Sequence, residues 1–249
     1  MGKKLLSRLK GIEWKLAVSI AGAGALLAVA SHTSLSWWSL ILFGGWLLGF
    51  YFSESRERRS IGAAFWIAAI LAAWGVDAAS HAEAPFYVPF GIIIAFMAVL
   101  SVCEALFRFV FRDRVSAYGV LNIGILFSLL LLFFSSPLTW FTLIAAGIGI
   151  AVLLREFLLF GGIAWRGRIM LASVTLSFLS LELALMIRFM PLSAISSAAF
   201  LALLLLLVRD ALSAHFEGRF NLAFALRGIV IFLFIAALIL GTALSGLFE

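Results

Sequence analysis

Residues 201–208 read Leu-Ala-Leu-Leu-Leu-Leu-Leu-Val, an apolar run without polar residues at alternate positions. Strands of a membrane barrel alternate apolar and polar residues, because one face meets lipid and the other faces the lumen. The run therefore predicts a helix. It belongs to an apolar segment over 192–208, which approaches the ~20 residues that a helix needs to cross the hydrocarbon core of a bilayer.

The composition of the whole chain is typical of a membrane protein. Of 249 residues, 65% are hydrophobic and 12% are charged, and the mean hydropathy is +1.19. An average soluble domain is about half apolar and about a quarter charged, so a soluble globule of this size could not bury so much apolar surface. These values exclude a soluble enzyme and a disordered chain. The single cysteine, Cys103, also excludes an internal disulfide and a cysteine-based zinc site.

Apolar segments recur along the whole chain, separated by charged or turn residues. They cover residues 16–31, 37–52, 62–80, 87–107, 118–134, 138–154, 169–187, 192–208 and 225–247. The shorter ones are expected to extend as helices into their flanks. The sequence predicts an all-α, polytopic integral membrane helix bundle with nine transmembrane helices and short loops. It predicts a single transmembrane domain over 1–249 and no soluble domain.

Basic residues indicate the orientation, because lysine and arginine gather in cytoplasmic loops. On the nine-helix map, all 18 lysine and arginine residues except Arg188 fall on one side. The N-terminus is therefore predicted to be cytoplasmic and the C-terminus to lie outside. The basic arm over 1–15 is either an interfacial helix that binds anionic lipid head groups or an ordinary positive-inside anchor.

The first apolar segment allows two interpretations. Basic residues, an apolar run and Ala28-Val29-Ala30 together resemble a secretory signal that is cleaved after Ala30. The alternative is an uncleaved first transmembrane helix, which the start of the sequence at Met1 favours. The rest of the map is the same in both cases.

Two pairs of segments share a pattern. Pro137-Leu138-Thr139 precedes a helix that ends near Arg155-Glu156, and Pro191-Leu192-Ser193 precedes a helix that ends near Arg209-Asp210. Each of these helices follows a serine-containing apolar segment. The pattern predicts that 118–160 and 169–214 are two parallel copies of one helical hairpin.

Ionisable residues inside a bilayer are costly, so they are candidates for function. Asp77, Glu182 and Arg188 form the candidate intramembrane polar site, near the predicted outer ends of their helices. One interpretation of Asp77 and Glu182 is an outward-facing site for an ion or a proton. The other is a structural contact, in which one carboxylate pairs with Arg188 and water reaches the other. Because Arg188 is the one basic residue predicted to lie outside, we expect Asp77 to pair with it.

The predicted inner ends carry acidic and basic neighbours. These residues form a candidate cytoplasmic polar ring, made of Glu104, Arg108, Arg155, Glu156, Arg209 and Asp210. Acid–base pairs of this kind commonly mark the membrane interface, and Glu104 precedes Arg108 at the spacing that favours a pair within one helix. We interpret the ring as closing the bundle rather than as a catalytic cluster.

Motifs of enzymes and of cofactor sites are missing. The sequence has no G-x-S-x-G, H-E-x-x-H or P-loop pattern. His32, His81 and His215 fall in predicted loops on different sides, so they cannot share one metal ion. No catalytic residue, metal or cofactor is therefore predicted.

One stretch resembles proteins of a known kind. Residues 181–193, Leu-Glu-Leu-Ala-Leu-Met-Ile-Arg-Phe-Met-Pro-Leu-Ser, are followed by Ser-Ala-His-Phe-Glu-Gly-Arg over 213–219. This stretch of about 40 residues resembles bacterial polytopic inner-membrane proteins of unknown function. The resemblance implies a bacterial inner-membrane location and assigns no activity and no functional residue.

Three classes of function remain from the sequence. The leading hypothesis is a non-catalytic membrane component, namely a scaffold, an assembly factor or a subunit of a membrane complex. The alternative is a small-solute or proton-coupled transporter that uses Asp77 and Glu182, and an intramembrane enzyme is third. The predicted partners are the bilayer, its anionic head groups and other membrane proteins, but not nucleic acid.

Overall fold

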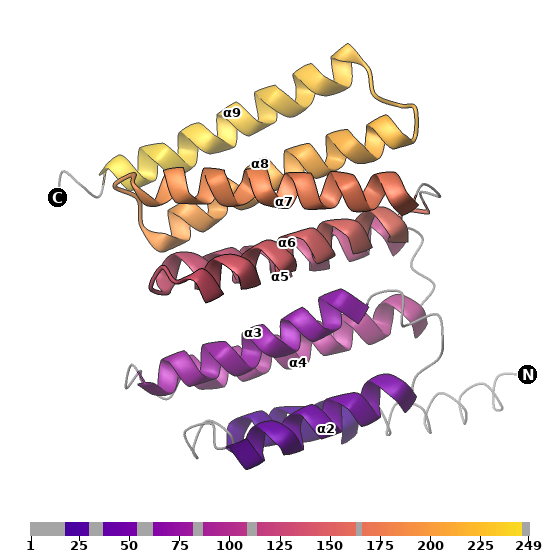
Figure 1. Cartoon of the computed structure of the whole chain (residues 1–249), viewed down its shortest axis with the longest axis vertical. Helices are drawn as coiled ribbons and strands as arrows, with labels where there is room; N and C mark the ends of the chain where they lie inside the picture. The colour runs from indigo at the N-terminus through magenta and orange to yellow at the C-terminus, as the bar shows by residue number, and fades with distance from the viewer. Residues whose placement is uncertain are drawn as a thin grey trace, which may run out of the picture. The chain divides into compact units, whose positions relative to one another are not determined.

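The computed structural model describes residues 18–29, 37–53, 62–81, 87–108, 114–162 and 166–245. These residues form nine helices and no strand, which confirms the predicted all-α bundle (Figure 1). The helices are Val18–Val29, α2 (Trp37–Ser53), α3 (Gly62–His81), α4 (Tyr87–Arg108), α5 (Arg114–Ser135), α6 (Trp140–Phe160), α7 (Arg166–Arg188), α8 (Ala194–Phe216) and α9 (Leu222–Ser245). The basic arm over 1–15 and Ala30 lie outside the described residues.

Six of the described helices, α3 and α5 to α9, are long and apolar enough to cross a membrane. Three others offer shorter apolar stretches, namely Val18–Val29, α2 with 17 residues and Tyr87–Cys103 within α4. The described helices are thus compatible with an integral membrane protein. The full count of nine crossings stays a prediction.

Helices α6 and α8 continue well beyond the charged pairs that were expected to lie near their ends. α6 runs to Phe160 and α8 to Phe216, so both charged pairs lie inside the last turns of their helices. The helices end instead at glycines with positive φ, Gly162 at 84° and Gly218 at 70°. Glycine adopts this left-handed conformation without a steric penalty, which makes it a common helix stop, whereas a single charged residue does not break a helix.

The N-termini of α6 and α8 share one capping arrangement. The side chains of Thr139 and Ser193 accept hydrogen bonds from the backbone N–H groups of Thr142 and Ser196. These bonds satisfy N–H groups that have no partner within the helix. Both caps follow the shared Pro-Leu pair, so the two local starts agree with the predicted repeat. That the two hairpins superpose stays a prediction.

The chain divides into two compact units, Met1–Arg112 and Asp113–Glu249. In the first unit, α3 packs against α4, and their apolar side chains are buried at residues such as Val76 and Leu100. The indole N–H of Trp46 on α2 donates to the carbonyl of Ser19, at 3.1 Å, which joins α2 to the helix Val18–Val29. The single transmembrane domain stays a prediction.

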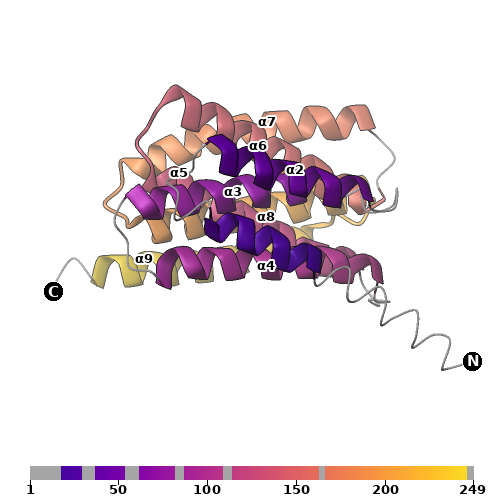
Figure 2. The same ribbon diagram turned by 90° about the horizontal axis from the view of Figure 1, so that it is seen from below.

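The second unit carries the polar side chains that concern function. Within it, α5 packs against α6 and α8, α7 against α6 and α8, and α9 against α8. Its helices lie side by side, and their axes are roughly aligned (Figures 1 and 2). The hydroxyl of Ser177 on α7 donates to the carbonyl of Gly147 on α6 at 2.5 Å. A Cβ atom at Gly147 would come within 2.8 Å of Leu181, so glycine permits this close approach.

Candidate functional site

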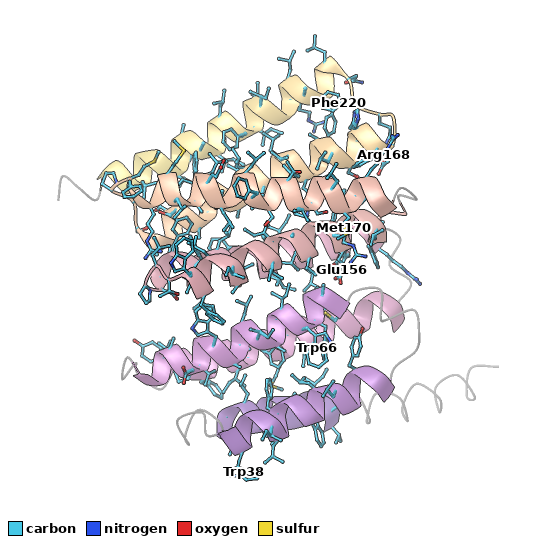
Figure 3. The ribbon with its side chains drawn as sticks, viewed as in Figure 1. Trp38, Trp66, Glu156, Arg168, Met170 and Phe220 are labelled. Atoms are coloured by element: carbon cyan, nitrogen blue, oxygen red, sulfur yellow. The ribbon has the colours of Figure 1, made fainter. Side chains whose placement is uncertain are left out.

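A buried polar cluster lies at one end of the second unit, where α5 begins and where α6 and α8 end. Its members are Tyr118 and Asn122 on α5, Glu156 on α6, and Arg209 on α8. Figure 3 labels Glu156 near the end of α6. Antiparallel packing brings the start of α5 beside the last turns of its two neighbours, so residues far apart in sequence meet there.

The acidic member of the cluster is Glu156, which is 8% exposed. The hydroxyl of Tyr118, itself fully buried, donates a hydrogen bond to Oε1 of Glu156. Asn122 lies one helical turn after Tyr118 and donates through Nδ2 to the carbonyl of Leu153 at 3.1 Å. These contacts join α5 to α6. A hydrogen bond to a carboxyl group out of water is among the stronger ones in proteins.

The amide oxygen of Asn122 is fully buried, and within the described residues it has no hydrogen-bond partner. A buried acceptor without a donor is costly. The Nδ2 group of the same side chain lies 3.5 Å from the Tyr118 hydroxyl oxygen, at the limit of a hydrogen bond. Within the described residues, the carboxyl group of Glu156 thus has a hydrogen-bond donor, whereas the amide oxygen of Asn122 has none.

The basic member is Arg209, which is 6% exposed. Its Cζ atom lies 3.9 Å from the centre of the Phe157 ring, and its NH1 group donates to the carbonyl of Gly119 at 3.3 Å. Its Nε and NH2 groups both donate to Oδ1 of Asp210, at 3.0 and 2.8 Å. A guanidinium group out of water gains strongly from an aromatic face and from an adjacent carboxylate.

Small size at position 119 makes room for this stacked arrangement. A Cβ atom at Gly119 would lie 3.2 Å from the Phe157 ring and 3.8 Å from the nearest guanidinium nitrogen. Phe157 in turn stacks against Tyr118, with ring centres 6.3 Å apart and planes 15° apart. Phe157 thus lies between the Tyr118–Glu156 pair and Arg209, and it packs the two halves of the cluster together.

The contacts of this cluster link three helices. Each charged side chain meets an opposite charge, a hydroxyl or a carbonyl, and the contacts tie α5, α6 and α8 together. Among the described residues, no three histidine, cysteine, aspartate or glutamate side chains gather as a metal site would require. We call Tyr118, Asn122, Glu156 and Arg209 the polar fastener, because their contacts join α5 to α6 and to α8.

The structure brings together part of the candidate cytoplasmic ring. Glu156, Arg209 and Asp210 lie in or beside the cluster, whereas Arg155 is exposed on α6. Glu104 and Arg108 lie on α4 in the first unit, and their side chains are outside the described ones. The ring as a whole stays a prediction.

Sequence reasoning missed Tyr118, Asn122 and Gly119. A signal was present, because tyrosine and asparagine four residues apart fall on one face of a helix. The amide of an asparagine in an apolar helix is costly to bury unless it finds hydrogen-bond partners. A search for polar residues as well as for charges would have found both.

Arg188, the basic member of the candidate intramembrane site, contacts backbone carbonyls. Arg188, at the end of α7, donates from NH2 to the carbonyl of Ser136 at 2.7 Å and from NH1 to the carbonyl of Phe133 at 3.3 Å. Phe133 lies in the last turn of α5 and Ser136 directly follows the helix. Backbone acceptors at a helix C-terminus lack helical partners, and the helix dipole attracts a cation there. Arg188 thus finds partners in its own unit that the sequence did not indicate.

The two acidic members lie on separate units. Asp77 is half-buried on α3 in the first unit, and Glu182 is exposed on α7 in the second. Pairing of Asp77 with Arg188 stays a prediction. Glu182 lies on the exposed side of α7.

We expect Arg188→Ala to lower the free energy of unfolding by about 1–3 kcal/mol, because two helix-terminal carbonyls lose a charged donor. The measurement is unfolding of the detergent-solubilised protein by increasing fractions of SDS. Arg227→Ala removes an exposed arginine from α9 and should change stability by less than ~0.5 kcal/mol. Equal losses in both variants would contradict the capping role of Arg188.

Comparison with known proteins gives no family for this chain. No family model, no curated protein and no solved structure matches it.

Proposed function

We propose that this protein is a non-catalytic component of a membrane complex, either a scaffold, an assembly factor or a subunit, and that α7 carries its contact surface. The observation that supports the proposal is a carboxylate, Glu182, in the middle of an exposed apolar helix face. The polar fastener packs α5, α6 and α8 of the second unit together. Glu182 on α7 is not part of it, so this packing does not explain the charge on α7.

The two sides of α7 differ in residue type. Small serines on the inner side are buried against neighbouring helices, and examples are Ser173 at 1% and Ser177 at 5% exposure. The outer side carries bulky residues, including Val174 at 53% and Phe178 at 63% exposure. Small residues let membrane helices approach closely, whereas bulky apolar residues are equally suited to lipid or to a partner. The apolar residues alone do not decide between the two.

Glu182 favours a partner. It lies one turn after Phe178 on the exposed side, and no hydrogen bond or ion pair to Glu182 is found among the described residues. An ionisable side chain that faces lipid is costly, and such residues almost always face a protein or an aqueous cavity. A membrane protein docked on α7 would remove Glu182 from lipid, which supports a scaffold or subunit over a transporter built on Asp77 and Glu182.

The experiment is purification from the native membrane in a mild detergent, followed by measurement of the native mass. The wild-type chain should purify with discrete membrane proteins as an assembly larger than one chain. Phe178→Ala should weaken this assembly, because Phe178 is 63% exposed on the proposed contact surface. The matched control is Phe234→Ala on α9, where the side chain is 66% exposed. The same loss in both variants, or no assembly at all, would contradict the proposal.

We also propose the bacterial inner membrane as the location, with the N-terminus in the cytoplasm and the C-terminus outside. The distribution of basic residues supports this orientation. A cysteine at Leu138, which is 46% exposed, should react with a membrane-impermeant thiol reagent in intact cells. A cysteine at Gly167, which is exposed at the start of α7, should react only after lysis. Both variants carry Cys103→Ala, and reversed labelling would overturn the orientation.

A further inference from the structure

We infer that the outer face of α7 binds a membrane-spanning helix of a different protein, and that this helix carries a basic side chain at the depth of Glu182. The inference rests on the proposed function and names the chemistry of the partner. We define the Glu182 face as Val174, Phe178, Glu182 and Met186. These residues follow one another at four-residue intervals, and all four are exposed.

The depth of Glu182 favours a charge partner. Glu182 precedes Arg188, the last residue of α7, by roughly 9 Å of helix at 1.5 Å per residue. The candidate span of α7 runs from Gly167 to Arg188, so Glu182 lies within the apolar part of the helix. A short glutamate side chain reaches the interface less easily than a long lysine or arginine does.

Arg188 does not neutralise Glu182. Six residues on an α-helix correspond to about 240° of rotation, so the two side chains leave the helix in different directions. The guanidinium group of Arg188 is also committed to the carbonyls of Phe133 and Ser136 on α5. The basic partner of Glu182 must therefore come from elsewhere.

The rest of this chain is a poor source of that partner. On the predicted orientation, every other lysine and arginine lies at the opposite membrane face. A second copy docked symmetrically on α7 would bring its own Glu182 against the first, and like charges in contact are unfavourable. Charge complementarity therefore selects a different protein with a lysine or arginine in a spanning helix.

The test uses synthetic transmembrane helices as probes. Three leucine-rich peptides differ only at one position, at the depth of Glu182, which holds lysine, leucine or glutamate. The full chain and each peptide carry fluorophores, and energy transfer between them is measured in phosphatidylcholine vesicles as the peptide-to-lipid ratio rises. We expect the lysine peptide to associate about tenfold more tightly than the leucine peptide, and the glutamate peptide to associate most weakly.

Variants of the chain show whether the charge carries this preference. Glu182→Gln keeps the shape and should reduce the preference for the lysine peptide severalfold. Glu182→Lys should reverse it, so that the glutamate peptide binds best. The control Met186→Leu changes an apolar residue of the same face and should keep the wild-type order. Each variant must first match the helical circular dichroism of the wild-type chain.

Three results would overturn the inference. They are equal binding of all three peptides, an order that Glu182→Lys does not reverse, and energy transfer between two labelled copies of the chain that depends on Glu182. The last result would assign the face to a second copy. The assembly in native membranes tests the proposed function separately. An assembly that depends on Phe178 but shows no charge preference would keep the function and reject this partner chemistry.

Discussion

Arg209→Met is expected to lower the free energy of unfolding by about 2–4 kcal/mol. The substitution removes the guanidinium group from the face of Phe157 and the hydrogen bond to the carbonyl of Gly119, and both lie out of water. Asp210 contributes less to the loss, because its side chain is 48% exposed and can be solvated when its partner is removed. The measurement is SDS-induced unfolding of the solubilised protein.

The chain contains a matched control for this variant. Arg155 occupies the same distance from its N-cap on α6 as Arg209 does on α8, but its side chain is exposed. Arg155→Met should therefore change stability by less than ~0.5 kcal/mol. Arg209→Lys should fall in between, because it keeps the charge and loses the planar stack. Equal effects of Arg155→Met and Arg209→Met would reject the fastener.

Tyr118→Phe is expected to cost about 1.5–3 kcal/mol, because Glu156 loses its hydroxyl donor while it remains buried. In Glu156→Leu, the acceptor is removed instead. The double variant should be more stable than the sum of the two losses predicts, by about 0.5–3 kcal/mol. Tyr87→Phe, at a side chain that is 72% exposed, is the control and should have little effect. Purely additive losses would show that the two side chains do not act together.

The class of fold could be predicted from the sequence because the bilayer imposes it. Long apolar runs without alternation allow only helices, since every backbone polar group must be satisfied within the segment. Helix ends were harder to predict. Arg155 and Arg209 were expected near the ends of their helices, but backbone conformation ends them at Gly162 and Gly218, where φ is positive.

Side-chain partners were the least predictable feature. Sequence reasoning selected charged residues, yet the buried partners of Glu156 and Arg209 include a tyrosine hydroxyl, a glycine carbonyl and an aromatic ring. A sequence does not show which backbone carbonyl or aromatic ring a side chain will contact. The contact depends on how each helix is rotated about its own axis, and adjacent positions on a helix lie 100° apart. Arg209 is buried while Arg155, at the equivalent distance from its N-cap, is exposed, and on α6 the buried position is the neighbouring Glu156.

Another membrane protein is expected to cover the outer face of α7. Photo-crosslinking in native membranes tests this contact, with a photoreactive amino acid at Phe178 on α7 and, as the control, at Phe234 on α9. Both positions are apolar and similarly exposed, at 63% and 66%. We expect discrete protein adducts at position 178 and only lipid adducts at position 234. Lipid adducts alone at both positions would contradict it.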